Sequence, residues 1–304
     1  MPPVTLRQAR ADDMTACARV HLSSATDLAR RLSSDPPQTP VAAMASGLAH
    51  LQRTDPRGFH VAERNGRVVA FAATILRGNT QFLSTFWILP SQQSQGIGRR
   101  LLTRAFERPN PPRTAVRCVF ASLDTRAQAL YVKFGMVPRG MFYFLKGRPK
   151  PLPRPRFAVA LEPMGEPGTT SREMLAMAAR FDRRCRGARR DQDIRYVMSL
   201  PGARFLAARA GRSTLGYAVL NEKGRLGPAV VTDPRYSAGL AWATLKTARE
   251  IGARELIVIV PGLNAGALET FFRAGLRTEF FGTWMSSRPV GSFEAYLLAG
   301  GMLL

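Results

Sequence analysis

The sequence predicts an α/β protein made of two tandem copies of one fold, each a mixed β-sheet flanked by helices. Three observations support this. Strand-like and helix-like segments alternate along the 304 residues, a proline-rich stretch divides the chain almost in half, and two segments of the first half recur weakly in the second. Such alternation is typical of sheets with helices packed on their faces. The length is sufficient for two separate cores.

Residues 147–156 read Gly-Arg-Pro-Lys-Pro-Leu-Pro-Arg-Pro-Arg. Prolines among basic residues favour an extended, rather stiff and solvated connector. We therefore predict one domain over residues 1–147, a linker over 148–156 and a second domain over 157–304.

The first half begins with a strand and two helices, followed by a hairpin around an Asn-Gly turn. A strand ended by a proline, an amphipathic helix, another strand, another helix and a last strand complete it. The strands, the hairpin and the other helices are expected at residues 4–8, 14–32, 41–52, 58–72, 82–89, 116–121 and 124–136. The amphipathic helix has Leu101, Leu102, Ala105 and Phe106 on one face.

The second half repeats this order. Its hairpin spans residues 203–218, and the pattern from Asp124 to Met136 is echoed from Asn264 to Leu276. Each copy of this pattern places Asp or Asn at the N-cap of a helix and Gly at the end of that helix. Residues 157–161 could open the second sheet or close the first. We infer a tandem duplication.

The amino-acid composition limits the classes of function that the protein can have. The formal net charge is +23, and nearly all of the 44 basic residues are arginines spread along the chain. Because the charge is diffuse, we attribute it to a general bias toward arginine, with some arginines binding a polyanionic cofactor, rather than to nucleic-acid binding. An RNA- or ribosome-associated protein stays an alternative.

Three scattered cysteines and three histidines lack the spacing of a disulfide framework or a metal site. No apolar run is long enough for a membrane helix, and no signal core opens the chain. We expect a cytoplasmic protein without metal.

One loop carries a ligand signature. The strand ending at Pro90 is followed by Gln93-x-x-Gly96-x-Gly98 and then by a helix. Glycines and a helix N-terminus together make a cradle of N–H groups for phosphate. The loop lacks the Gly-Lys-Ser/Thr of a Walker A motif and the third glycine of a Rossmann fingerprint. An ordinary glycine-bearing turn is the alternative.

The loop resembles the acetyl-CoA signature of the GNAT superfamily of N-acetyltransferases. The segment Asp124-x-x-Ala127-x-x-Leu130-Tyr131-x-x-x-Gly135-Met136 resembles its second signature, in which Asn and Phe usually stand at the positions of Asp124 and Met136. The resemblance implies two tandem GNAT-like (acyl-CoA N-acyltransferase) domains with splayed sheets. It also implies an acyltransferase that moves acetyl from acetyl-CoA to a primary amine by direct attack.

The same resemblance implies which residues bind acetyl-CoA, namely Ile88, Leu89, Pro90, Gln93, Ser94, Gln95, Gly96, Ile97, Gly98, Arg99, Arg100, Asp124, Ala127 and Tyr131. The thioester arm of the cosubstrate is expected between the fourth and fifth strands.

The resemblance also implies catalytic roles. Tyr131 is expected to protonate the departing CoA thiolate, for which a phenol is chemically apt, although a tyrosine merely packed in the core is the alternative. Backbone N–H groups of Ile88 or Leu89 are expected to stabilise an oxyanion. Asp124 either binds the pantetheine arm or only caps its helix.

The sequence does not identify a general base. Many relatives have Glu at the position of Ser84. Glu63, His60 and the terminal carboxylate of Leu304 are weak candidates. A non-catalytic acyl-CoA-binding regulator is therefore an alternative to the enzyme. The acceptor is an unidentified small-molecule or peptide amine, and a monomer or homodimer is expected.

The second half lacks the signature. Aligned on Pro234, the positions of Gln93, Gly96 and Gly98 hold Ser237, Leu240 and Trp242, and Tyr131 becomes Phe271. Side chains then occupy space that the backbone needs near a pyrophosphate. We predict a degenerate domain that keeps the fold and binds no acetyl-CoA. It either shapes the acceptor site or is purely structural.

Overall fold

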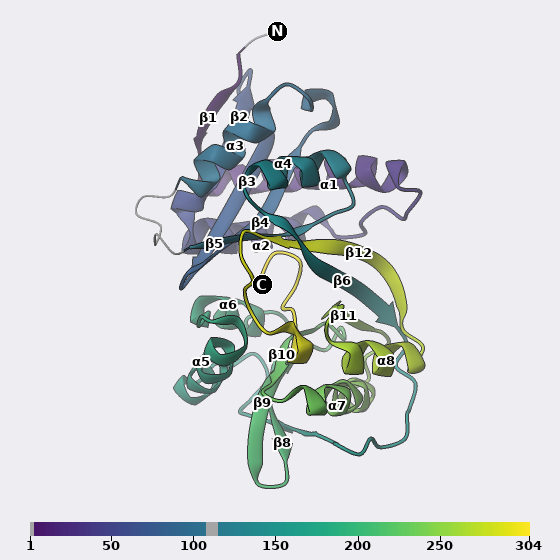
Figure 1. Cartoon of the computed structure of the whole chain (residues 1–304). Helices are drawn as coiled ribbons and strands as arrows, with labels where there is room; N and C mark the ends of the chain where they lie inside the picture. The colour runs from purple at the N-terminus through teal and green to yellow at the C-terminus, as the bar shows by residue number, and fades with distance from the viewer. Residues whose placement is uncertain (1–2, 108–114) are drawn as a thin grey trace. The chain divides into compact units, whose positions relative to one another are not determined.

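The computed structural model describes residues 3–107 and 115–304 (Figure 1). It divides into two compact units, Met1–Val137 (unit 1) and Pro138–Leu304 (unit 2). The division comes before residue 147, where the sequence places the end of the first domain, because strand β6 (Val137–Gly147) pairs with β11 (Leu256–Pro261) of unit 2. The boundary between the sequence repeats themselves stays a prediction. No helix in the described ranges is long and apolar enough to cross a membrane.

Unit 1 contains the predicted elements in the predicted order except the last strand, β6, of which the division assigns all but Val137 to unit 2. They are β1 (Thr5–Gln8), α1 (Met14–Arg31), α2 (Val41–Thr54), β2 (Phe59–Arg64), β3 (Arg67–Arg77), β4 (Thr80–Ile88), α3 (Ile97–Phe106), β5 (Val116–Ala121) and α4 (Thr125–Lys133). The strands lie in the order β1-β2-β3-β4-β5. The β4–β5 pair is parallel and the others are antiparallel.

Local chemistry explains the first elements of unit 1. Asn65 and Gly66 have φ of 51° and 71°, the left-handed pair that a two-residue hairpin turn requires. Helix α3 buries Leu101, Leu102 and Ala105 completely against the sheet. This amphipathic face is the one that the sequence predicts, and it fixes the helix that follows the signature loop.

Strand β4 separates two helix layers. A Cβ on Gly98 of α3 would lie 3.0 Å from the Phe86 ring and 3.2 Å from Ile88 Cδ1. Trp87, between these two residues, instead contacts His21 of α1, with ring centroids 4.5 Å apart. Because successive side chains of a strand point to opposite faces, α1 and α3 cover opposite faces of β4.

Strands β4 and β5 separate before β4 ends. Their register pairs Thr80–Leu83 with residues 116–119 and goes no further along these described strands. The β3–β4 register shifts between Ala73/Thr74, which leaves Ser84 as an extra residue of β4. A bulge of this kind bends a strand and increases its twist. The result is a wedge between β4 and β5, from Ser84 to Ile88.

Unit 2 has a similar order of elements. Besides β6 and β11 it contains β7 (Ala160–Pro163), α5 (Arg172–Arg186), α6 (Asp191–Met198), β8 (Arg204–Ala210), β9 (Ser213–Leu220), β10 (Leu226–Val231), α7 (Ser237–Glu250), α8 (Ala265–Arg273), β12 (Arg277–Ser286) and β13 (Tyr296–Leu297). One sheet has the order β13-β10-β9-β8-β7, and β12, β6 and β11 are neighbours in the other. Strand β7 pairs with β8, so the segment after the linker opens the sheet of unit 2.

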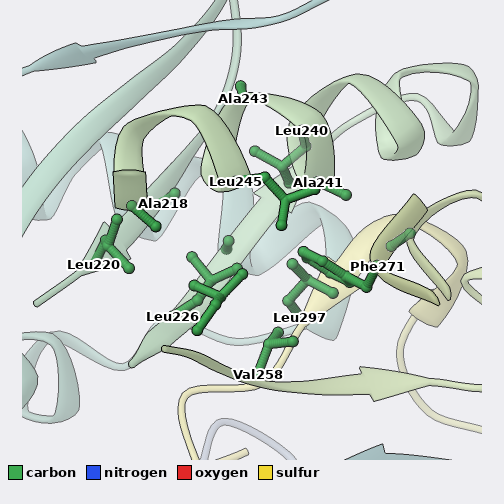
Figure 2. Close-up of a cluster of buried hydrophobic side chains, with 14 of the residues drawn as sticks. Ala218, Leu220, Leu226, Leu240, Ala241, Ala243, Leu245, Val258, Phe271 and Leu297 are labelled. Atoms are coloured by element: carbon green, nitrogen blue, oxygen red, sulfur yellow. The ribbon is translucent and has the colours of Figure 1, made fainter. Parts of the chain in front are cut away.

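The core of unit 2 lies between its sheets and helices α7 and α8 (Figure 2). Leu240 and Leu245 of α7, Phe271 of α8 and Val258 of β11 are all buried there. The predicted linker has no helix or strand from residue 148 to 156, and its Leu152 carbonyl accepts a hydrogen bond from Trp242 Nε1 at 3.0 Å. Cys17, Cys118 and Cys185 are buried and free.

Candidate active site

The signature loop turns the backbone through two left-handed residues. Ser94 and Gly96 have φ of 61° and 74°, and α3 begins at the next residue, Ile97. The first N–H groups of a helix have no carbonyl to bind within it. Here the helical ladder starts with Arg100 N–H donating to Gly96 O. The amides before it, at the positive end of the helix dipole, form an anion cradle.

Glycine is required at the two signature positions for different reasons. Gly96 adopts a conformation that side chains disfavour, although a Cβ there would meet nothing within 4 Å. Gly98 instead allows α3 to pack closely on Phe86 of β4 and on Leu130 of α4, whose Cδ2 would lie 3.4 Å from an added Cβ. The expectation that both glycines clear space for phosphate is therefore refined, since Gly98 serves packing.

Polar side chains of the loop stabilise the loop itself. Gln93 Nε2 donates to the Ile88 carbonyl at 3.0 Å, and Gln95 Nε2 donates to the Ser91 carbonyl at 3.2 Å. Arg100 donates to the Val4 carbonyl at 3.1 Å. Arg99 is exposed beside the amide cradle. These residues fit a polyanionic cosubstrate, with the backbone and Arg99 available to its phosphates.

The end of β4 selects one of the two expected oxyanion donors. Leu89 N–H donates to the Val69 carbonyl of β3 at 3.0 Å, so it is already engaged. Ile88 lies opposite Ala70 in the adjacent non-hydrogen-bonded position, so its N–H and C=O point away from β3. The Ile88 carbonyl accepts from Ser24 Oγ at 2.9 Å and from Gln93. Its N–H is thereby directed to the wedge side of β4.

Tyr131 is buried on α4, with its ring edge-on to Phe86 at a centroid distance of 6.3 Å. Burial, with a smaller contribution from the Asp124 charge, raises the pKa of Tyr131 well above its usual value. The phenol therefore keeps its proton at neutral pH. A protonated phenol can donate a proton, and the catalytic role of Tyr131 stays a prediction.

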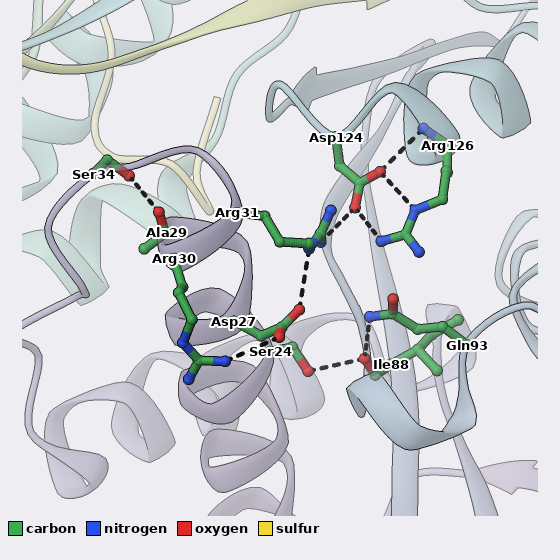
Figure 3. Close-up of polar contacts among 10 residues, drawn as sticks. All are labelled: Ser24, Asp27, Ala29, Arg30, Arg31, Ser34, Ile88, Gln93, Asp124 and Arg126. Atoms are coloured by element: carbon green, nitrogen blue, oxygen red, sulfur yellow. Dashed lines mark hydrogen bonds and ion pairs between the residues drawn. The ribbon is translucent and has the colours of Figure 1, made fainter.

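Asp124 forms ion pairs with two arginines and caps a helix (Figure 3). Its side chain caps α4 by accepting from Arg126 N–H at 3.0 Å, and it forms ion pairs with Arg126 at 3.1 Å and with Arg31 at 3.0 Å. Burial opposes ionisation, but the hydrogen bonds from Arg126 and Arg31 hold the pKa of Asp124 at about 2. The carboxylate is thus a cap whose charge two guanidinium groups compensate.

The three base candidates are engaged or face elsewhere. Glu63 accepts from Arg7 Nε at 2.6 Å. His60 lies opposite Ala72 of β3, which lies opposite Phe86 of β4, so His60 shares the face of the sheet that α3 covers. Burial, and then the charge of Arg104, lowers the pKa of His60. In unit 2, the backbone oxygen of Leu304 accepts from the buried Arg190. Sequence reasoning did not consider His21, which has no motif to mark it.

Unit 2 lacks the loop. Its turn at Pro234–Tyr236 is followed directly by α7, which begins at Ser237. The residues aligned with the Gln93–Gly96 loop therefore form the first helical turn, and Leu240 is buried within it. Phe271, at the position of Tyr131, is fully buried and has no hydroxyl.

The corresponding wedge of unit 2 is filled by the chain itself. Strands β10 and β11 approach at the Arg225–Ile257 bridge. Beyond it β13 pairs antiparallel with β10, and Leu298 N–H donates to the Ile259 carbonyl of β11 at 3.2 Å. Asn264, the counterpart of Asp124, donates from Nδ2 to the Tyr296 carbonyl at 3.3 Å. We call residues 296–298 the plug segment.

No group of three or more potential metal-ligating side chains is present among the residues that the structure describes. Two surface hollows lie along α7 of unit 2, and one of them is lined by Lys246, Arg249 and Glu250. Neither hollow includes a predicted site residue.

Comparisons with known proteins agree with this fold. Residues 25–136 match the model of the acetyltransferase (GNAT) family. A candidate acetyltransferase from Pyrococcus horikoshii is 19% identical, with 99% of this chain and 96% of that chain covered at a TM-score of 0.76. A GCN5-related N-acetyltransferase from Sphaerobacter thermophilus is 15% identical, with 97% and 99% covered at a TM-score of 0.66.

A tandem GNAT protein from the clavulanic acid biosynthesis pathway is 17% identical, with 94% of this chain and 99% of that chain covered at a TM-score of 0.56. No curated protein matches the sequence with significance. These likenesses extend over nearly the whole chain and confirm the predicted fold class.

Proposed function

Residues 25–136 form a domain of the acetyltransferase (GNAT) family, and we propose that this chain transfers the acetyl group of acetyl-CoA to a primary amine by direct attack. Family and fold support an acyl-CoA-dependent N-acetyltransferase in general. The amine acceptor, a small molecule or a peptide, and the roles of individual residues are the proposed part.

One observation carries the proposal. The amide cradle at the start of α3 and the Ile88 N–H meet at the same end of the β4–β5 wedge, because the loop from Pro90 to Gly96 joins them directly. A phosphate-bearing arm bound at the cradle can then extend along β4 past Ile88. Acetyl-CoA has both parts, a pyrophosphate and a thioester at the far end of a long arm.

Each residue then has a role. The cradle amides and Arg99 hold the pyrophosphate. Ile88 N–H donates to the thioester carbonyl oxygen as negative charge develops there. Tyr131 gives its phenolic proton to the departing thiolate. Acetyl-CoA supplies the activated acyl carbon, so no metal step is needed in this proposal.

We propose one cosubstrate site per chain. In unit 2 the loop is helical, the phenol is replaced by Phe271, and the plug segment lies along β10. A second acetyl-CoA would have to displace a paired strand and its hydrogen bonds. Unit 2 therefore has a structural role in this proposal.

Calorimetry with acetyl-CoA, followed by an amine panel with detection of free thiol, tests the function. Ethanolamine, glycinamide, glucosamine and an aminoglycoside sample the acceptor classes. We expect one site per chain and thiol release with at least one amine. Binding without release across the panel would instead favour a non-catalytic acyl-CoA-binding regulator. Steeply salt-dependent RNA retention on filters would favour an RNA-associated enzyme.

A further inference from the structure

His21 of α1 has an unusual environment. Its ring packs on Trp87 of β4 at a centroid distance of 4.5 Å and an interplanar angle of 36°. Its Nδ1 atom is buried and has no hydrogen-bond partner in the described part of the chain. A buried polar atom left without a partner lowers stability, so each such atom calls for an explanation.

His21 lies close to the reacting end of β4. Ser24 is three residues further along α1 and therefore shares a face of the helix with His21. Ser24 Oγ donates to the Ile88 carbonyl at 2.9 Å, as Figure 3 shows. One face of α1 thus contacts both Trp87 and Ile88, whose N–H is the proposed oxyanion donor.

The opposing strand contributes a second unsatisfied group. Thr85 is two residues before Trp87 and shares its face of β4. Thr85 Oγ1 is also buried without a partner among the described residues. The layer between α1 and β4 therefore holds two orphaned polar atoms beside one aromatic ring. This is the arrangement expected where a polar substrate group enters.

The electrostatics keep the imidazole neutral. Burial lowers the pKa of His21 to about 4. Cys17, one turn earlier on α1, is also buried, and burial raises the pKa of its thiol. Helix α2, which packs on α1, carries a further buried histidine, His50. A neutral ring has a nitrogen lone pair ready to accept a proton at physiological pH.

We propose that His21 is the general base of the transferase, acting from the α1 face of β4. This inference rests on the proposed function. The amine nitrogen forms a bond to the thioester carbon as the carbon–sulfur bond breaks. The imidazole of His21 takes the proton released by that nitrogen, and Tyr131 gives its proton to sulfur. The imidazolium then loses its proton to water, and the phenolate regains one from water.

A weakly basic imidazole is sufficient for this step. Once the nitrogen has added to the carbonyl carbon it is far more acidic than a free ammonium group. The imidazole therefore needs only to collect a proton that is already labile. The amine itself has to arrive uncharged, which agrees with the apolar surface that Trp87 provides.

The variant His21→Gln tests the assignment, and His60→Gln is its matched control. His60 is also a histidine with a buried, unpartnered Nδ1, but it lies on the α3 side. Each protein is measured by calorimetry with acetyl-CoA and by thiol release with glycinamide and the other panel amines. We expect His21→Gln to bind acetyl-CoA with unchanged affinity while kcat falls about 100-fold. His60→Gln keeps the wild-type kcat.

A rescue experiment separates base catalysis from structure. In His21→Ala, added imidazole should restore part of kcat, in proportion to its unprotonated fraction. Wild-type kcat in His21→Gln, a parallel loss of acetyl-CoA affinity, or no rescue by imidazole would overturn the base assignment while the transferase stands. A wild-type protein that binds acetyl-CoA yet acetylates no panel amine would overturn the proposed function and the base assignment together.

Discussion

The two units have similar strands on either side of their wedges, but among the described residues only the wedge of unit 2 is filled by a strand of the chain itself. In unit 1 the loop after β4 contains two left-handed residues, and Ile88 N–H faces the gap beside β5. In unit 2 the corresponding turn continues straight into α7, and β13 pairs along β10. A few backbone conformations therefore separate a wedge that we propose to receive a ligand from one that the chain itself fills.

The pair Asp124 and Asn264 shows the difference at single residues. Asp124 caps the helix that follows β5, and Asn264 caps the helix that follows β11, through Arg126 N–H and Ala267 N–H respectively. Asn264 has a donor left over, which holds the Tyr296 carbonyl of the plug segment. Asp124 has no donor and instead pairs with Arg31 and Arg126. The amide binds a peptide carbonyl, whereas the carboxylate binds cations.

Exchanging the loop residues should have the largest effect. Gly96→Leu with Gly98→Trp gives unit 1 the residues of unit 2, and we expect acetyl-CoA affinity to fall more than about 100-fold. Leu at a φ of 74° is strained, and Trp at residue 98 meets the Phe86 ring. Calorimetry measures the affinity, and circular dichroism checks that the variant is folded.

The reciprocal control is Leu240→Gly with Trp242→Gly in unit 2. We expect the stoichiometry to stay at one acetyl-CoA per chain, since β13 still pairs with β10. A second site in this variant would show that side chains alone, and not the plug segment, close the wedge of unit 2.

Removing the phenol of unit 1 should affect turnover and not binding. We expect Tyr131→Phe to lower kcat about 100-fold with unchanged acetyl-CoA affinity, since the ring packing on Phe86 is retained. The high pKa of Tyr131 also predicts that the wild-type rate shows no loss from phenol ionisation near neutral pH. Thiol release across a pH series measures both, and unchanged turnover would remove Tyr131 from the mechanism.

The plug segment should contribute stability to unit 2 without influencing cosubstrate binding. Asn264→Ala removes a helix cap and the bond to the Tyr296 carbonyl. We expect a loss of about 1–2 kcal/mol in the free energy of unfolding. Urea denaturation measures the loss. A change in acetyl-CoA affinity would contradict the separation of the two wedges.

The smallest effect is expected at Asp124. Asp124→Asn keeps a capping side chain and removes two partly exposed ion pairs, so stability at neutral pH should fall by less than about 1 kcal/mol. Because folding lowers the pKa of Asp124 to about 2, its stabilisation is present above about pH 4 and is lost as the pH falls toward 2. The difference between variant and wild type in urea denaturation should therefore shrink on acidification. A constant difference would show that the ion pairs contribute nothing.

Local signals in the sequence predicted much of unit 1. The Asn65-Gly66 turn, the proline after β4 and the spacing of Leu101, Leu102 and Ala105 each depend on neighbouring residues, so their outcome can be read without the fold. The cap at Asp124 and the amide cradle at Gly96 follow for the same reason. The predicted elements of unit 1 were accordingly found within a few residues of their expected ends.

Three features depended on the tertiary structure. The ring of His21 reaches Trp87, Leu89 N–H bonds to Val69, and the plug segment enters between β10 and β11. Each joins residues far apart in the sequence through a register or a helix face that no local pattern specifies. The chain by itself therefore determined where the glycine-bearing loop with its amide cradle forms and where it is missing. Long-range packing decided which backbone amide faces the wedge of unit 1, which imidazole packs on Trp87 of β4, and which strand closes the wedge of unit 2.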